Sequence, residues 1–177
     1  LFPTGYSGIR KIKTGGWRDD TDGPMQVLSG PIGHEKVHYQ APPSERVEAE
    51  MQALLDWINA PLTLDGIVHA AIAHLWFVTI HPFEDGNGRI ARALAERSLA
   101  RSEQSSQRFY SLASEIRRER PSYYASLEAA QKGELEITPR LLWFIACVSK
   151  AIDAAEIGHA AVLRKANFWQ RHADVIL

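Results

Sequence analysis

One short stretch of the chain, residues 81–92, contains the residue types needed to hold a polyphosphate and to move a proton beside it. It reads His-Pro-Phe-Glu-Asp-Gly-Asn-Gly-Arg-Ile-Ala-Arg. His81 opens the stretch and is the natural general base, since an imidazole exchanges protons near neutral pH. Asp85 offers a hard oxygen ligand of the kind that Mg²⁺ binds together with substrate phosphates. The stretch therefore predicts a site for phosphate chemistry.

The second half of this stretch is predicted to bind the phosphates. A helix is expected to begin at Gly88 or Arg89, which leaves free N–H groups and the positive end of the helix dipole facing the turn. Gly86 and Gly88 lack a Cβ and allow the backbone to approach an anion closely. Asn87 between them can add a side-chain amide donor. Arg89 and Arg92 lie three residues apart on one helical face and can bind phosphates bidentately.

The elements that must position this stretch are expected to be mainly helical. Apolar residues at helical spacing, capping residues and prolines at helix starts mark these helices. They are expected from Ser44 to Asn59, after a cap at Asp65, from near Gly88, from Pro121 to Gly133, and from Thr138 onward, where Gly158 could interrupt the last one. The residues expected to face inward on the second and third helices are Val68, Ile72, Leu75, Trp76 and Thr79, and Ile90, Leu94 and Leu99.

One β-hairpin is expected before the helices. Residues 25–29 and 36–40 alternate roughly between polar and apolar types, and the glycines and proline between them favour a turn. A two-stranded hairpin is marginal alone, so it must lie on the helices. We expect a single, mainly α domain that is divided into a loop region at 1–24, the hairpin at 25–40, a helical core at 44–157 and a C-terminal helix at 159–177.

The composition argues against several classes of protein. The net charge of −1 creates no overall field that would attract nucleic acid or an acidic membrane. A single cysteine, Cys147, excludes an intrachain disulfide and a multi-cysteine zinc site, and its apolar surroundings suit a buried thiol in a reducing cytoplasm. No apolar run reaches membrane-spanning length. The chain starts without methionine at Leu1 and ends within a patterned segment, so it is expected to be a piece of a longer protein.

The other histidines have no motif around them, and structural or surface roles are expected for His34, His38, His69, His74 and His159. The spacing of five residues between His69 and His74 does not place two ligands on one helix face, which argues against a zinc protease.

The stretch at residues 81–92 resembles the signature of the Fic family, His-x-Phe-x-(Asp/Glu)-Gly-Asn-Gly-Arg-x-x-Arg, and matches it at every fixed position. Residues 8–59, with Trp17-Arg18 and the hairpin, look like the segment that precedes the core in that family. The resemblance implies a Fic-type helical bundle and a protein adenylyltransferase. Such an enzyme transfers AMP from ATP to a tyrosine, threonine or serine hydroxyl of a target protein and releases pyrophosphate.

The same resemblance implies a role for each site residue. His81 would deprotonate the target hydroxyl, and Asp85 would hold Mg²⁺ on the α- and β-phosphates. The phosphates would be bound by Gly86, Asn87, Gly88 and Arg89, with Arg92 on the γ-phosphate. The hairpin, called the flap in that family, would add an extended segment of the target as a further strand, with Val27, Leu28 and Ser29 nearest the nucleotide. Tyr123-Tyr124, Leu127 and Gln131 look like the segment that lines the adenine pocket, although two adjacent tyrosines can equally be core.

Many members of the family are held inactive by a helix with the pattern (Ser/Thr)-x-x-x-Glu-(Gly/Asn), whose glutamate pairs with the arginine that is Arg92 here. The nearest match, Ser111 to Glu115, is followed by Ile116 and lies in the wrong place. The helix is therefore expected upstream of this chain. A winged-helix domain is expected to follow near Phe168-Trp169, and nucleic acid would be contacted only through that domain. The long apolar C-terminal helix could contribute to a homodimer.

Other functions remain open on the sequence. The same site could remove AMP from a modified protein, or use another nucleotide or a diphosphate-linked alcohol. A kinase-like use is disfavoured because the Gly-Asn-Gly-Arg turn is intact. A transcriptional regulator that senses ATP without transferring AMP is the alternative from another class, and the intact His81 argues against it, since binding phosphate needs no base.

Overall fold

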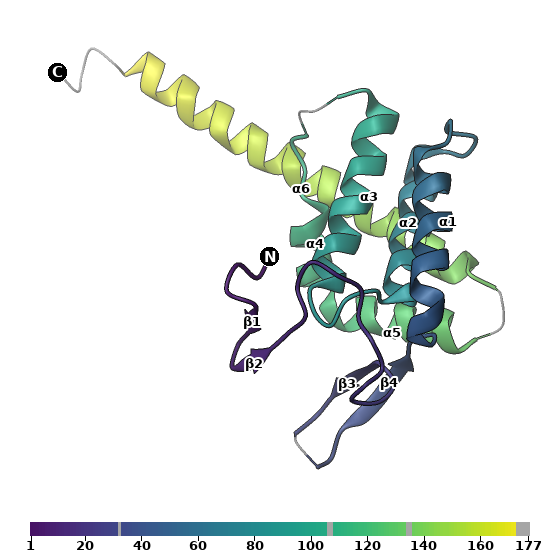
Figure 1. Ribbon diagram of the computed structural model, residues 1–177. Coiled ribbons are helices and arrows are strands. Elements are labelled where there is room, and N and C mark those ends of the chain that lie inside the picture. The colour runs from purple at the N-terminus through teal and green to yellow at the C-terminus, as the bar shows by residue number, and fades with distance from the viewer. Residues whose placement is uncertain (32, 106–107, 134–135, 173–177) are drawn as a thin grey trace.

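The structure is a computed structural model that describes residues 1–31, 33–105, 108–133 and 136–172, and it is mainly helical (Figure 1). The elements in chain order are β1 (Tyr6–Ser7), β2 (Arg10–Lys11), β3 (Gln26–Ser29), β4 (Lys36–Gln40), the 3-10 turn η1 (Ser44–Arg46), α1 (Val47–Asn59), α2 (Gly66–Ile80), α3 (Asn87–Glu103), α4 (Leu112–Arg118), α5 (Arg120–Lys132) and α6 (Thr138–Arg171). The predicted fold class, mainly α with one small hairpin flap, is confirmed. None of the described helices is both long and apolar enough to cross a membrane.

Helix α2 is the centre of the bundle and contacts α1, α3 and α6. The start of α2 was predicted from its capping residue, and its end is set by a change of backbone conformation. The Asp65 carboxylate caps its start by accepting hydrogen bonds from the N–H groups of Ile67 and Val68, at 2.9 and 3.3 Å. Its C-terminal cap is His81, which adopts a left-handed backbone conformation with φ of 50°. The helix therefore ends at the residue that the sequence predicts to be the base.

The predicted inward face of α2 was partly wrong. Leu75 is buried as expected and Trp76 packs partly buried against the core, but Val68, Ile72 and Thr79 are only half-buried. On α3 the prediction agrees with the packing, since Leu99 is buried and Ile90 and Leu94 pack partly buried against the core. The fully buried side chains of these two helices include several alanines: Ala70, Ala71 and Ala73 on α2, and Ala91 and Ala95 on α3. Because α2 is covered on several sides and packs closely on α3 through small residues, large apolar side chains did not mark its buried face.

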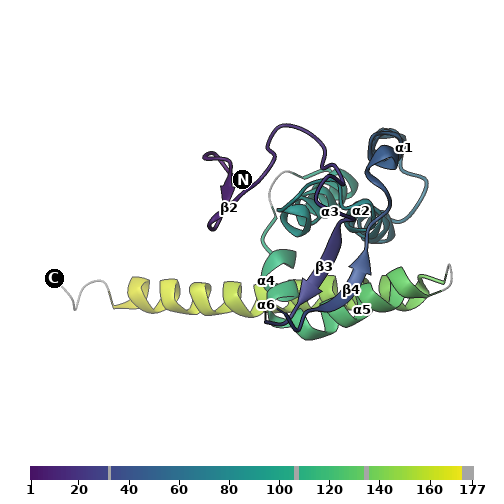
Figure 2. The same ribbon diagram turned by 60° about the horizontal axis from the view of Figure 1, so that its bottom comes forward.

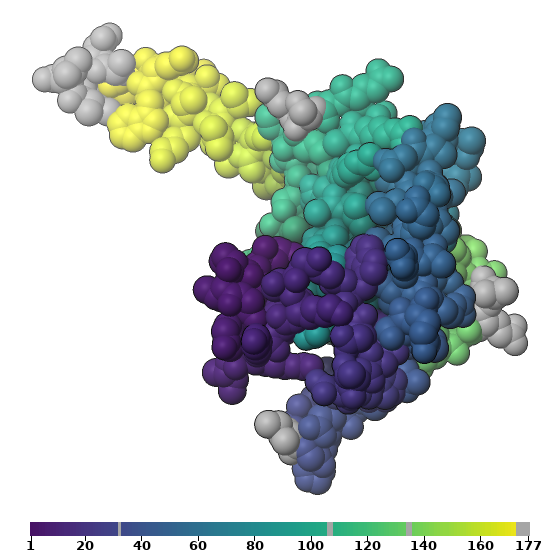
Figure 3. Space-filling model, viewed as in Figure 1, coloured from purple at the N-terminus to yellow at the C-terminus, as the bar shows by residue number. Residues whose placement is uncertain are grey.

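The C-terminal helix also differs from the expectation. Helix α6 runs from Thr138 to Arg171 through Gly158 without a break, so no separate helix begins at residue 159. Nothing lies within 4 Å of the position of a Cβ at Gly158, and one glycine costs a helix only about 1 kcal/mol. The last turns of α6 project from the body of the protein (Figures 2 and 3). Helix α4 and the short β1–β2 ladder were not predicted.

Two glycines in helices provide a matched test of this packing. A Cβ at Gly66 would overlap the side chain of Ser102 on α3, whereas a Cβ at Gly158 would meet nothing. We expect Gly66→Ala to lower the free energy of unfolding by about 1–3 kcal/mol, the usual range for overpacking. Gly158→Ala is expected to leave it unchanged or raise it by up to about 1 kcal/mol. Urea denaturation of both variants measures this, and equal effects would contradict the close α2–α3 contact.

Candidate functional site

The loop between α2 and α3 is braced from within by Asn87. The side-chain Oδ1 of Asn87 accepts a hydrogen bond from the N–H of Phe83 at 3.0 Å, and its Nδ2 donates to the carbonyl of Phe83 at 2.6 Å. The Phe83 ring packs against Phe77 of α2, with ring centroids 6.3 Å apart. One N–H of the Asn87 amide is therefore used within the loop, and the predicted contact of this amide with an anion stays a prediction. The amide shapes the turn, and the backbone of the turn is left to face a ligand.

His81 is held as a neutral imidazole. Its Nδ1 lies 3.2 Å from the carbonyl oxygen of Val78, and a carbonyl can only accept, so Nδ1 carries the proton and Nε2 keeps a lone pair. Burial lowers the pKa of His81 below its ordinary value, and the nearby Arg18 charge adds to this. The hydrogen bond to Val78 and the charge of Asp85 oppose the shift without cancelling it. The ring of His81 is thus neutral at neutral pH, with its one proton on Nδ1.

Asp85, in contrast to His81, is held in its charged form. Burial raises its pKa, but hydrogen bonds from the Ser7 hydroxyl and the Gly86 N–H outweigh that effect, and electrostatic interactions with Arg89 and His81 add to them. The net result is a lowered pKa and an ionised carboxylate. Gly86, with φ of 85°, is the N-cap of α3, so the first N–H groups of that helix are next to the carboxylate.

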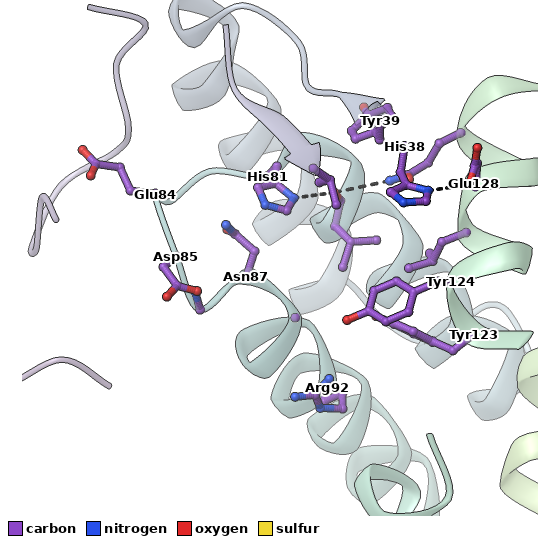
Figure 4. A pocket seen from close by; sticks show the side chains of 16 residues that line it. His38, Tyr39, His81, Glu84, Asp85, Asn87, Arg92, Tyr123, Tyr124 and Glu128 are labelled. Carbon is purple, nitrogen blue, oxygen red and sulfur yellow. Dashed lines mark hydrogen bonds and ion pairs between the residues drawn. The ribbon is translucent and has the colours of Figure 1, made fainter. Parts of the chain in front are cut away.

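These groups line one pocket of about 220 Å³ between the loop, the flap and α5 (Figure 4). Of the residues predicted from sequence, the pocket contains Val27, His81, Asp85, Gly86, Asn87, Gly88, Arg92, Tyr124, Leu127 and Gln131. In Figure 4 the ring of Tyr124 lies across the pocket from the loop, and Arg92 lies on α3, beyond the first turn of that helix. The pocket thus brings the loop to the segment of α5 on which the adenine prediction falls. What each residue does there remains a prediction.

Three residues predicted for the site lie outside this pocket. The guanidinium of Arg89 lies over the ring of Phe2, 4.6 Å from its centroid. Leu28 is exposed on the flap, and the hydroxyl of Ser29 lies 2.5 Å from Nε2 of His38. The register of the hairpin is irregular between Val27 and Leu28, so only the first of the predicted flap residues is directed to the pocket.

The flap contributes two pocket residues that the sequence did not reveal, His38 and Tyr39. The Nδ1 of His38 lies 2.7 Å from a carboxylate oxygen of Glu128 on α5, a contact of the structural kind expected for this histidine. The hydrogen bond from His38, followed by that from Lys132, lowers the pKa of Glu128 to about 2. The hydroxyl of Tyr39 donates to the carbonyl of Thr79 at 2.8 Å. His38 and Glu128 are far apart in the chain, and no sequence pattern links them.

A buried polar network holds the wall of the pocket at Tyr123. Arg140 is 1% exposed, and its Nη2 lies 3.3 Å from Nδ1 of His74. Since arginine only donates, Nδ1 accepts, and Nε2 of His74 then carries the proton that points to the Tyr123 hydroxyl, 3.4 Å away. Burial, with the charges of Arg140 and Arg92, holds the pKa of His74 well below its ordinary value. His74 is therefore neutral and structural, as expected.

The arrangement of His81 predicts its titration. In an NMR titration of the ring protons, we expect a pKa below the ordinary 6.5, because burial opposes the imidazolium. Asp85→Asn is expected to lower it further, since the Asp85 charge favours the protonated ring. A pKa at or above 6.5, or a rise in the Asp85→Asn variant, would contradict this account of the site.

Comparison with known proteins agrees with this geometry. Residues 5–99 match the sequence model of the Fic/DOC family. The protein named "Protein adenylyltransferase fic-1" from Caenorhabditis elegans is 43% identical over 93 residues, which is 51% of this chain and 17% of that protein. "Protein adenylyltransferase Fic" from Nematostella vectensis is 36% identical over 115 residues, 64% of this chain and 25% of that protein. The chain thus spans a quarter or less of the length of these two relatives.

Solved structures show the same fold. A crystal structure of a Fic family protein from Desulfovibrio desulfuricans superposes with a TM-score of 0.67 at 28% identity, covering 86% of this chain and 43% of that one. Fic-1 from Caenorhabditis elegans gives a TM-score of 0.54 at 32% identity, covering 81% of this chain and 38% of that one. Since the family match spans more than half of the sequence, the chain belongs to the Fic/DOC family.

Proposed function

We propose that this chain is the catalytic unit of a protein adenylyltransferase that moves AMP from ATP to a hydroxyl group of a target protein. The observation that carries the proposal is a neutral His81, with Nε2 unprotonated, in the same pocket as the first turn of α3 and Arg92. A base beside an anion-binding helix end suits transfer of a phosphate-linked group to a hydroxyl. The names of the two adenylyltransferases described above support the same reaction.

The pocket accounts for the parts of ATP. The backbone at Gly88 and the first N–H groups of α3 receive the phosphates, and Arg92 binds the terminal phosphate. The adenine lies at the far end, against Tyr124, Leu127 and Gln131 of α5. The hydroxyl attacks the α-phosphorus while Nε2 of His81 takes its proton. The new bond joins the target oxygen to phosphorus, the bond to the β-phosphate oxygen breaks, and pyrophosphate leaves.

Asp85 fits a Mg²⁺ ion that accompanies the nucleotide. The carboxylate is ionised and exposed at the end of the phosphate-binding turn. Among the described residues no group of three or more acidic, histidine or cysteine side chains could hold a metal by itself. This suits Mg²⁺, which binds through one or two carboxylates together with substrate phosphates. The ion would neutralise charge on the phosphates.

The flap offers a place for the target. Strands β3 and β4 form a two-stranded antiparallel sheet, in the part of the chain that the structure describes, so each strand has a backbone edge that does not pair with the other. We propose that an extended segment of the target adds to this sheet, which is a common mode of peptide recognition. Val27 at the pocket wall would then lie nearest the hydroxyl and the nucleotide. Main-chain pairing explains why the flap sequence names no particular target.

Labelled ATP tests the reaction. The chain is incubated with a cell lysate, Mg²⁺ and ATP carrying ³²P at either the α- or the γ-position. We expect label from the α-position only. His81→Ala should slow labelling by about 10²–10⁴-fold, the usual contribution of a positioned base. Arg92→Ala should weaken ATP binding by roughly 10-fold or more, as loss of a charge-assisted contact does.

Arg97→Ala is the matched control, since Arg97 lies on the same helix but bonds to Asn59 on the surface. Labelling by this variant should equal that of the unmodified chain. Label from the γ-position would replace the proposal with a kinase. Binding of ATP without label from either position would favour removal of AMP or the ATP-sensing regulator.

We also propose that an upstream helix bearing the inhibitory glutamate regulates this site through Arg92. Within the described residues Arg92 has no ion-pair partner, so its guanidinium can receive such a carboxylate. A longer form of the protein that includes this segment should bind ATP more weakly and label more slowly. Replacing its glutamate by glycine should restore both. The proposal fails if the longer form matches the shorter one in ATP affinity and activity.

A further inference from the structure

A second cavity, of about 250 Å³, lies beside the pocket just described. The two share Arg92, Tyr123 and Tyr124 as a common wall, and Figure 4 shows these three side chains together at one end of the first pocket. The other side of the second cavity is formed by α4 and the start of α5, which supply Arg117 and Arg120. The cavity is thus lined by arginines from three helices, and no acidic side chain is among its described lining residues.

The charges of these arginines are not balanced within the described part of the chain. Arg92, Arg117 and Arg120 form no ion pair there, whereas neighbouring basic residues do. Arg118 pairs with Glu115 at 3.2 Å, and Lys150 pairs with Glu119 at 2.7 Å. The two carboxylates closest in sequence are therefore already occupied, and the positive charge of the cavity is left for a ligand.

Three of the residues that line the cavity, Arg120, Tyr123 and Tyr124, make other contacts within the protein. The guanidinium of Arg120 lies over the ring of Tyr124, 5.6 Å from its centroid. Tyr123 is only 4% exposed and is held by His74 and Arg140 in the network described above. Guanidinium groups arranged around a small cavity match phosphate, because each can donate two parallel hydrogen bonds to phosphate oxygens.

We propose that this cavity is a second phosphate-binding subsite, which takes a phosphate group beyond the three of ATP. The ligand is either free pyrophosphate or the terminal phosphate of a nucleotide with a longer polyphosphate chain. The inference rests on the proposed function only in naming ATP as the occupant of the first pocket. Arg92 lies between the two cavities, so that one guanidinium can contact the phosphates in both.

Calorimetric titration with sodium pyrophosphate, without metal, tests the subsite directly. The double variant Arg117→Gln/Arg120→Gln removes two charges but keeps hydrogen-bonding side chains. We expect it to bind pyrophosphate about 10–100-fold more weakly, since hydrogen bonds to charged groups contribute about 1.5–3 kcal/mol. Arg118→Gln is the matched control, because Arg118 is adjacent in sequence, is ion-paired and does not line the cavity. Its affinity for pyrophosphate should be that of the unmodified chain. Thermal unfolding of all three proteins checks that they fold alike.

A second titration distinguishes the two sources of the phosphate. If the subsite takes the end of a longer chain, adenosine tetraphosphate should bind more tightly than ATP, and the double variant should lose that difference while keeping its affinity for ATP. If the subsite takes only free pyrophosphate, adenosine tetraphosphate and ATP should bind equally well, and the double variant should lose affinity for pyrophosphate alone.

Some results would overturn the subsite. The first is that the double variant binds both ligands as tightly as the unmodified chain. The second is that Arg118→Gln loses as much affinity for pyrophosphate as the double variant does. The third is that the unmodified chain does not bind pyrophosphate and binds adenosine tetraphosphate no more tightly than ATP. The labelling experiment is independent of these results. Absence of α-label with the unmodified chain would refute adenylyl transfer, whether or not pyrophosphate binds. A double variant that binds both ligands as tightly as the unmodified chain would refute the subsite, whether or not AMP is transferred.

Discussion

The buried guanidinium of Arg18 connects the segments on which the site depends. Its Nε donates to the carbonyl of His81 at 2.8 Å, and its Nη2 donates to the carbonyls of Pro42 and Ile80. These include carbonyls at the end of α2, which have no partner inside the helix and attract a cation. The charge is balanced by Asp20 at 2.7 Å. One side chain thus joins the loop before the flap, the segment that leads into α1 and the backbone of His81. It lies 3% exposed, where water cannot replace those bonds.

The depth of each residue within the loop sets its charge. His81 lies at the buried end, where the cost of desolvation keeps the imidazole neutral, and the Val78 carbonyl selects the tautomer with a free Nε2. Asp85 lies at the exposed end, where the donors from Ser7 and Gly86 keep its carboxylate ionised. A neutral imidazole and an ionised carboxylate can therefore occur four residues apart in the same loop. Asn87 maintains the separation, because both halves of its amide are bonded to the backbone of Phe83.

The flap and α5 close the pocket by contacts of a different kind. A two-stranded hairpin is marginal by itself, so its position depends on the hydrogen bond between His38 and Glu128 and on the hydrogen bond of Tyr39 to α2. The first of these contacts is partly exposed, so water competes for it. Tyr123, by contrast, is fixed from behind by His74 and Arg140 in the core. The wall at Tyr123 is therefore fixed by contacts in the core, whereas the wall formed by the flap is held by a few contacts, one of which is partly exposed to solvent.

The sequence by itself determined the position of the loop and predicted its chemistry. His81, Asp85, Gly86 and Gly88 lie within a few residues of one another, so local backbone rules were enough to predict a helix end, a turn and a helix start around them. The mainly α fold and the hairpin also followed from periodicity. Only the tertiary structure decided which distant side chains meet around the loop and its pockets. Arg89 lies over Phe2, His38 meets Glu128, and Arg92 joins Arg117 and Arg120 around a second cavity. The physical reason is that these meetings depend on how helices and strands pack, and packing brings together residues whose separation along the chain carries no periodic signal.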